Sequence, residues 1–119
     1  MKNLTIIVPD YNMEEYLAKC CESVVVAPEL MERLEVLVVN DGSTDGTSEI
    51  AHVFERRYPG SFRVIDKQNG HYGSCVNRGL AEAKGEFVKL LDADDTYDKA
   101  EFERHLKFLV EGSANGALD

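Results

Sequence analysis

Aspartates follow the apolar segments of this sequence, at the point where each segment ends. Asp10 comes after the first segment, Asp41 after the second and Asp66 closes the third, while the last is followed by Asp92, Asp94 and Asp95. Like charges gathered in one place raise one another's pKa unless a cation or hydrogen-bond donors share the space. Carboxylate oxygens suit Mg²⁺ and Mn²⁺, whose remaining positions are filled by water or phosphate oxygens. The pattern therefore predicts a divalent-cation site for a phosphorylated substrate.

The segments that carry these aspartates have the pattern of β-strands. They are short, continuous and rich in β-branched residues, as in parallel strands that are covered on both faces. Lys89 interrupts the last one, so we expect that strand to be less fully enclosed. The predicted strands are 4–9, 34–40, 62–66 and 86–92.

Apolar residues at three- and four-residue steps predict helices between the strands. The first helix begins near Met13, with Asn12 and Glu15 in a capping-box arrangement, and ends before Pro28. The others are centred on 50–58, 76–83 and 102–109, the last ending at Gly112. This βαβαβαβα order predicts a Rossmann-like α/β fold, an open and mainly parallel sheet with helices on both faces. Residues 4–111 form the predicted domain, and 112–119 a tail or cut linker.

Parallel strands end at one edge of a sheet, where ligands of open α/β folds bind near the point of strand-order reversal. The aspartates are therefore predicted to meet at the ligand site. Taken by itself, each motif could also have a purely structural role. Asp41-Gly42 and Asn69-Gly70 are common turns, and Asp94-Asp95 could cap a helix. Their occurrence in one order along one edge favours a site.

Length and charge exclude several classes of protein. The chain has 119 residues and a formal net charge of −9, so it is at most one domain and lacks the basic face that nucleic acids require. No apolar run approaches the length of a membrane span. Three cysteines, two of them adjacent, imply no disulfide framework. A cytoplasmic setting is expected, with the inner face of the membrane as an alternative for the full-length protein.

Taken together, the motifs resemble family-two glycosyltransferases of the GT-A type, in the half that binds the nucleotide-sugar. The resemblance covers nearly the whole chain and is specific as a set. The motifs are IIVPDYN (6–12), VVNDGSTDGT (38–47), NGHYGSCVNRGLAEAKGEF (69–87) and LLDADD (90–95).

The resemblance implies roles for individual residues. Tyr11 would lie against the uracil ring, Asp41 would accept a hydrogen bond from its imide, and Pro9 is expected in the donor site. Asp94 would contact the ribose and, with Asp95 and Asp92, would hold Mn²⁺ or Mg²⁺ against the diphosphate. Asn69 and Asn77, in the third motif, are expected in the donor site. The implied reaction transfers a sugar from a UDP-sugar to a hydroxyl of a carbohydrate, lipid or protein, with inversion.

Two departures from the family pattern bear on this function. Val76 stands where the family commonly has arginine, so Lys67, Arg78 or His71 would have to meet the donor phosphate. The general base is expected beyond Asp119, together with the acceptor half and further strands. We therefore expect a truncated GT-A domain that binds donor weakly, turns over poorly and self-associates through an exposed sheet edge.

Other classes of protein share part of this pattern. A phosphoacceptor receiver domain is similarly short, acidic and metal-dependent, but its acidic pair follows the first strand rather than the fourth. A nucleotidyltransferase would need a glycine-rich basic loop near Asp10. A non-catalytic nucleotide-sugar-binding module remains open, since sequence does not separate it from an enzyme.

Overall fold

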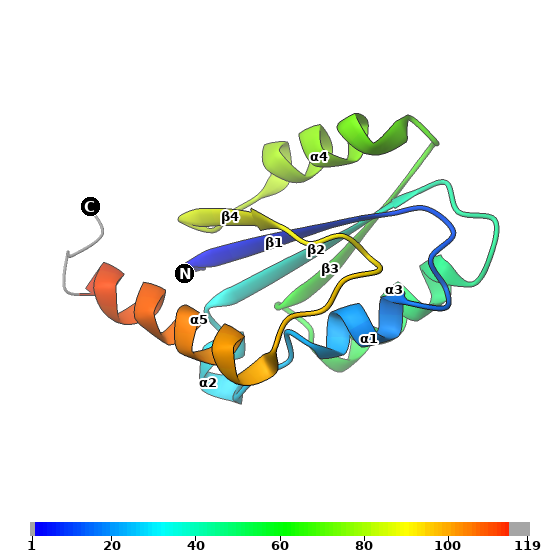
Figure 1. Cartoon of the computed structure of the whole chain (residues 1–119). Helices are drawn as coiled ribbons and strands as arrows, with labels where there is room; N and C mark the ends of the chain where they lie inside the picture. Colours follow the sequence, from blue (N-terminus) through cyan, green and yellow to red (C-terminus); the bar gives the residue numbers. More distant parts are fainter. Residues whose placement is uncertain (1, 115–119) are drawn as a thin grey trace.

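The computed structural model describes residues 2–114 and contains one open sheet between two unequal layers of helices (Figure 1). The strands within this range are β1 (Leu4–Asp10), β2 (Leu34–Asp41), β3 (Phe62–Lys67) and β4 (Phe87–Leu90), in the order β3-β2-β1-β4. All pairings are parallel. The predicted α/β fold class is confirmed, and the strand order reverses between β1 and β4.

Helices cover both faces of the sheet, as the alternating pattern predicts. Helix α4 (His71–Glu82) lies alone on one face (Figure 1), over a small cluster that includes Ile7, Val39 and Cys75. The larger core lies on the other face, under helices α1 (Leu17–Glu22), α2 (Pro28–Met31), α3 (Thr47–Arg57) and α5 (Lys99–Ala114). Every residue of β1 and β2 is buried, which explains their largely apolar sequences.

The edge strand β4 is less enclosed than the central strands. Val88 is 38% exposed and Leu90 46% exposed, because β4 has one neighbour in the sheet and few side chains cover it. The partial enclosure expected from Lys89 is thus confirmed, while self-association through this edge stays a prediction. Among residues 2–114, no helix has the length and apolar character needed to cross a membrane.

The helix boundaries correct several expectations. The capping box at Asn12 is wrong: α1 begins at Leu17, and the Asn12 side-chain oxygen accepts the Thr44 N–H at 2.8 Å instead. Helix α2 was not predicted, although Pro28 suits its first position. Helix α5 continues past Gly112 to Ala114, and positions 115–119 of the predicted tail lie outside the described residues.

Close contact between α4 and β1 depends on Gly79. A Cβ atom at this position would lie 2.7 Å from the Ile7 Cγ2 atom, closer than packed side chains approach. We expect Gly79→Ala to lower the free energy of unfolding by about 1–3 kcal/mol through overpacking. Gly73 on the same helix has open space around it and is the matched control. Gly73→Ala should raise stability by up to about 1 kcal/mol in the same urea titration, since alanine is the better helix former. Equal effects of the two substitutions would contradict tight packing at Gly79.

Candidate active site

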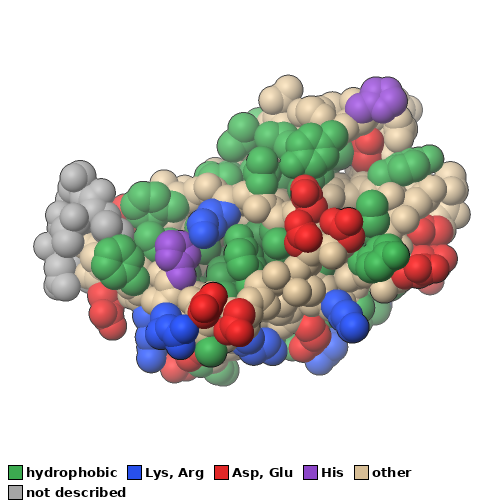
Figure 2. All heavy atoms as spheres, viewed as in Figure 1, with side chains coloured by type: hydrophobic (Ala, Val, Ile, Leu, Met, Phe, Trp, Pro, Cys, Tyr) green, Lys and Arg blue, Asp and Glu red, His purple; other side chains and the backbone are tan. Residues whose placement is uncertain are grey.

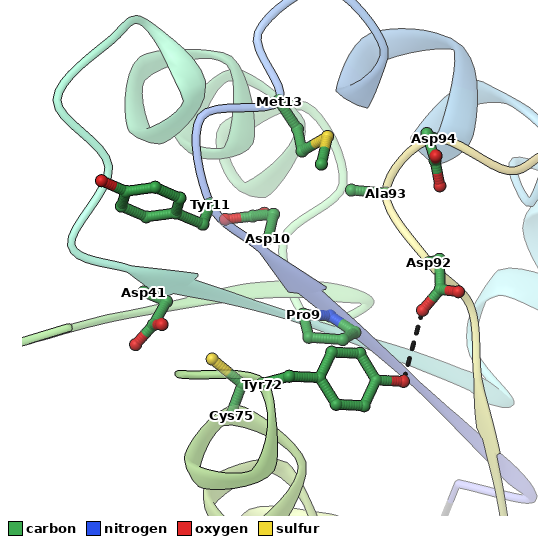
Figure 3. A pocket seen from close by; sticks show the side chains of 10 residues that line it. All are labelled: Pro9, Asp10, Tyr11, Met13, Asp41, Tyr72, Cys75, Asp92, Ala93 and Asp94. Carbon is green, nitrogen blue, oxygen red and sulfur yellow. Dashed lines mark hydrogen bonds between the residues drawn. The ribbon is translucent and has the colours of Figure 1, made fainter. Parts of the chain in front are cut away.

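A pocket of about 360 Å³ lies beyond the carboxyl ends of β2, β1 and β4, at the predicted position. It includes the point where strand order reverses. Figure 3 shows side chains from β1, β2, α4 and the segment after β4 directed around this space. The lining residues are Pro9, Asp10, Tyr11, Met13, Asp41, Tyr72, Cys75, Asp92, Ala93 and Asp94.

The predicted site residues divide into those that line the pocket and those that lie near it. Pro9, Tyr11, Asp41, Asp92 and Asp94 line it, and Tyr11 is 46% exposed. The other three predicted residues do not line the pocket. Asn69 donates from Nδ2 to the Asp41 carbonyl at 3.1 Å, and Asn77 is exposed on α4. Asp95 follows Asp94 in the turn after β4. Their roles stay predictions.

Asp41 is held in place by three donors. Its Oδ1 atom accepts hydrogen bonds from Lys67 Nζ at 2.9 Å and from the Gly70 N–H at 2.8 Å, and its Oδ2 atom accepts the His71 N–H at 2.9 Å. Burial opposes ionisation, but these bonds outweigh it and hold the pKa of Asp41 below its ordinary value. Asp41 is therefore an ionised acceptor at neutral pH.

The same contacts explain why α4 begins earlier than the sequence predicts. Helix starts leave backbone N–H groups without intrahelical partners. Asp41, which is about thirty residues away along the chain, accepts two of them at Gly70 and His71. Gly42 permits the close approach of the two loops, since a Cβ there would lie 2.9 Å from the Asn69 nitrogen. The capping carboxylate comes from β2, so local periodicity does not reveal it.

The cations that the sequence offered for a donor phosphate are mostly engaged elsewhere. Lys67 Nζ donates to Asp41, to the Gln68 carbonyl and to Ser74 Oγ. Arg78 pairs with Glu82 on its own helix. Of the three candidates, His71 keeps a side chain that is exposed beside the pocket. The pocket itself carries acidic groups, so an anionic ligand requires a cation.

Asp92, Asp94 and Asp95 form a group that fits a divalent cation. Each can offer a carboxylate oxygen, and these oxygens lie within 4.8 Å of one another. All are exposed, and Figure 2 shows acidic side chains gathered over the segment that follows β4. A donor set of oxygen atoms only, open to solvent, suits Mg²⁺ or Mn²⁺ with water or phosphate completing the shell.

Asp66 is drawn away from the pocket, contrary to the expected gathering of all strand-end aspartates. Its Oδ1 atom accepts from Asn40 Nδ2 at 2.8 Å and Ser48 Oγ at 2.9 Å, and its Oδ2 atom lies 2.7 Å from His52 Nε2. These partners lie on β2 and α3. Asp66 thus ties α3 to the sheet and does not line the site.

Sequence reasoning missed Tyr72 and the burial of Asp10. Tyr72 donates from its hydroxyl to Asp92 Oδ1 at 3.3 Å across the pocket (Figure 3). An aromatic residue directly after Asn69-Gly70-His71 is the signal that could have indicated it. Asp10 is 3% exposed. Burial, followed by the charges of Asp66, Asp45 and Asp41, raises its pKa to about 8.

Comparison with known families settles what kind of protein carries this pocket. The family model described as "Glycosyl transferase family 2" matches residues 5–119. The chain belongs to glycosyl transferase family 2. The GT-A type inferred from the motifs agrees with this membership and with the open parallel sheet.

Curated relatives of this family-2 chain are longer proteins. An uncharacterized glycosyltransferase of Mycoplasma pneumoniae, the MG025 homolog, is 36% identical over 102 residues, covering 84% of this chain and 34% of its own length. The minor teichoic acid biosynthesis protein GgaB of Bacillus subtilis is 34% identical, covering 92% of this chain and 12% of its own. The chain spans about a third or less of the length of these relatives.

Solved structures share the same fold. TarS 1-349 of S. aureus in complex with UDP-GlcNAc has a TM-score of 0.77 and 32% identity, covering 95% of this chain and 32% of that one. The mannosyltransferase PcManGT of Pyrobaculum calidifontis, in complex with GDP-Man and Mn²⁺, has a TM-score of 0.67 and 25% identity, covering 89% and 32%. Membership of this family replaces the receiver-domain interpretation.

Proposed function

We propose that this family-2 chain forms the donor site of a glycosyltransferase that uses a UDP-sugar. In this proposal the uracil lies between Tyr11 and Asp41, and the diphosphate lies near Asp92, Asp94 and Asp95. The sugar passes to a hydroxyl of a carbohydrate, lipid or protein acceptor with inversion at the anomeric carbon.

The observation that carries the proposal is the open acceptor on Asp41. Its Oδ1 atom already accepts two hydrogen bonds, whereas Oδ2 accepts one backbone N–H, that of His71. The Cys75 thiol also interacts with Asp41, but it is a weak donor that a ligand N–H can displace. A carboxylate oxygen has room for a second donor. Uracil carries one N–H on its pairing edge, while cytosine carries no proton at that nitrogen. An ionised Asp41 at the pocket wall therefore favours uracil over cytosine at that nitrogen, in keeping with the UDP-sugar complex of TarS.

The cation has a proposed place at the other end of the pocket. Asp92, Asp94 and Asp95 would hold it, and when bound it would neutralise the diphosphate and stabilise the leaving group. Tyr72 keeps Asp92 oriented through its hydroxyl hydrogen bond. The Mn²⁺ in the mannosyltransferase complex supports a cation of this kind.

The rest of the reaction is assigned to residues outside this chain. We infer that the general base and the acceptor site lie in the part of the protein that corresponds to the remaining two thirds of the relatives, and that the chain alone binds donor without turning it over. Cys20, Cys21 and Cys75 are free and buried, which favours a reducing, cytoplasmic setting.

A nucleotide scan by thermal unfolding tests the proposal. With Mn²⁺ present, UDP at a hundredfold over its dissociation constant should stabilise the chain by about 2.7 kcal/mol, a rise of several degrees for a domain of this size. GDP, CDP and ADP at the same concentration should give smaller shifts. Equal shifts with all nucleotides, or no shift with any, would contradict a uracil-specific donor site.

A further inference from the structure

Asp10 lines the donor pocket with a carboxyl group that has no partner. Both of its oxygen atoms are buried, and neither makes a hydrogen bond to any residue in the range 2–114. Buried polar groups are nearly always paired, because an unpaired one keeps the full cost of leaving water. Strand propensity offers no reason for aspartate here, since the preceding residues of β1 are apolar apart from Thr5. Because Asp10 lines the site, its unpaired carboxyl group favours a role in ligand binding.

The surroundings of Asp10 leave it without an internal donor. In the sheet it pairs in register with Asn40, whose side-chain amide donates to Asp66 at 2.8 Å and accepts the Ser43 N–H at 3.3 Å. Asn40 is therefore committed to other groups. The charges that act most strongly on Asp10 are those of the carboxylates Asp66, Asp45 and Asp41. Three thiols respond to the charge of Asp10 in turn: Cys20, Cys21 and Cys75.

The strand order places Asp10 in the middle of the pocket. The sheet edge runs from β2 through β1 to β4, so Asp10 lies between Asp41 and the Asp92–Asp94 segment. If the base lies at Asp41 and the diphosphate at the acidic group, the part of a nucleotide between them is the ribose with its α-phosphate. Figure 3 shows Asp10 between Tyr11 and Met13 in this central position. Met13 lines the same pocket and is unbranched, and its backbone N–H donates to Thr47 Oγ1 at 2.8 Å, so its side chain can rotate while its backbone stays in place.

From this placement we propose that Asp10 is a ligand-binding residue of the donor site, whose carboxyl group donates a hydrogen bond to an oxygen of the ribose–α-phosphate segment. This assignment rests on the proposed function. It adds a ligand contact for the Asp10 carboxyl group, which has no hydrogen-bond partner among the described residues. A carboxylate would repel a phosphate, but a protonated carboxyl donates. Burial and the neighbouring acids raise the pKa of Asp10 to about 8, so the donating form prevails at pH 7.

Two variants separate hydrogen bonding from packing. Asp10→Asn keeps a donor that does not titrate, and Asp10→Val removes the donor while suiting a buried strand. In titration calorimetry of the whole chain with UDP and Mg²⁺ at pH 7, we expect Asp10→Val to bind about tenfold more weakly, as for a lost hydrogen bond to a charged group. Asp10→Asn should stay within about threefold of the parent chain.

The pH profile gives a second readout. Between pH 7 and 9, UDP affinity of the parent chain relative to Asp10→Asn should fall as Asp10 loses its proton, because the group changes from donor to anion. Taking the ratio cancels titrations that the two proteins share. Asp10→Val should unfold at a higher urea concentration than the parent chain, which shows that weaker binding does not come from a damaged fold.

Shorter ligands identify the contacted oxygen. A penalty in Asp10→Val that appears with UMP and UDP but not with uridine assigns the α-phosphate, and a penalty with all three assigns the ribose. The role of Asp10 is overturned if Asp10→Val binds UDP as tightly as the parent chain and if the affinity of the parent chain relative to Asp10→Asn does not change with pH. The proposed donor site would stand in that case. Absence of UDP binding by the parent chain overturns both the donor site and this contact.

Discussion

Asp41→Asn is expected to weaken UDP binding by on the order of tenfold to a hundredfold, the range for a hydrogen bond to a charged acceptor. Asparagine has an NH2 group in place of one acceptor oxygen. This group would face the Gly70 N–H, the His71 N–H or the base, and in each orientation one hydrogen bond to residue 41 is lost. Lys67, which is mostly buried, would also lose its ionic partner. Titration calorimetry with UDP and Mg²⁺ measures the loss directly.

The choice of base distinguishes recognition by Asp41 from general damage to the site. An asparagine amide can donate to the unprotonated ring nitrogen of cytosine, so the preference for UDP over CDP should fall by about tenfold in Asp41→Asn. The exposed Glu49 on α3 provides a matched control, and Glu49→Gln should leave both affinities unchanged. A UDP-to-CDP ratio that stays constant in Asp41→Asn would show that Asp41 does not read the base.

Asp95→Asn is expected to remove most of the cation dependence of UDP binding. The acidic group of Asp92, Asp94 and Asp95 would lose one of its anionic oxygens, and UDP affinity with Mn²⁺ should fall by on the order of tenfold to a hundredfold. Uridine has no diphosphate, so its affinity should not change. Chelation by EDTA should weaken UDP binding by the parent chain much more than by the variant.

Asp98→Asn is the control for this second prediction. Asp98 follows the acidic group in the sequence but accepts the Glu101 N–H at 3.0 Å at the start of α5, and asparagine caps helices about as well as aspartate. It should therefore keep both its stability and its response to Mn²⁺. If Asp95→Asn and Asp98→Asn behave alike, the acidic group is not the cation site.

The strands could be predicted from sequence because strands that are buried on both faces consist mostly of apolar residues. Leu4–Asp10 and Leu34–Asp41 are buried at every position, and both are largely apolar in sequence. Parallel pairing then brings their final aspartates to one edge, so the location of the site followed from the fold class. The motifs added a prediction that geometry alone does not make, namely which of the aspartates contact a nucleotide.

Helix starts and the chemistry of single carboxylates could not be predicted in the same way, because their partners are distant in sequence. Asn12 matches a capping box, yet its side chain serves Thr44. Helix α4 starts at His71 because Asp41 accepts two amides there. Asp66 follows its strand like the other aspartates, but His52 and Asn40 hold it outside the pocket. Local patterns identify groups that need partners, and tertiary structure decides which partner each one takes.

The anchoring of Asp41 also has a thermodynamic consequence for affinity. Lys67 and the two amides at the start of α4 restrict its carboxylate to one rotamer before any nucleotide arrives. Ordering a free side chain during association costs about 0.5–1.5 kcal/mol, and here folding has already done it. The residue proposed to read the base is thus preorganised, and its orientation should persist through many cycles of donor binding and release.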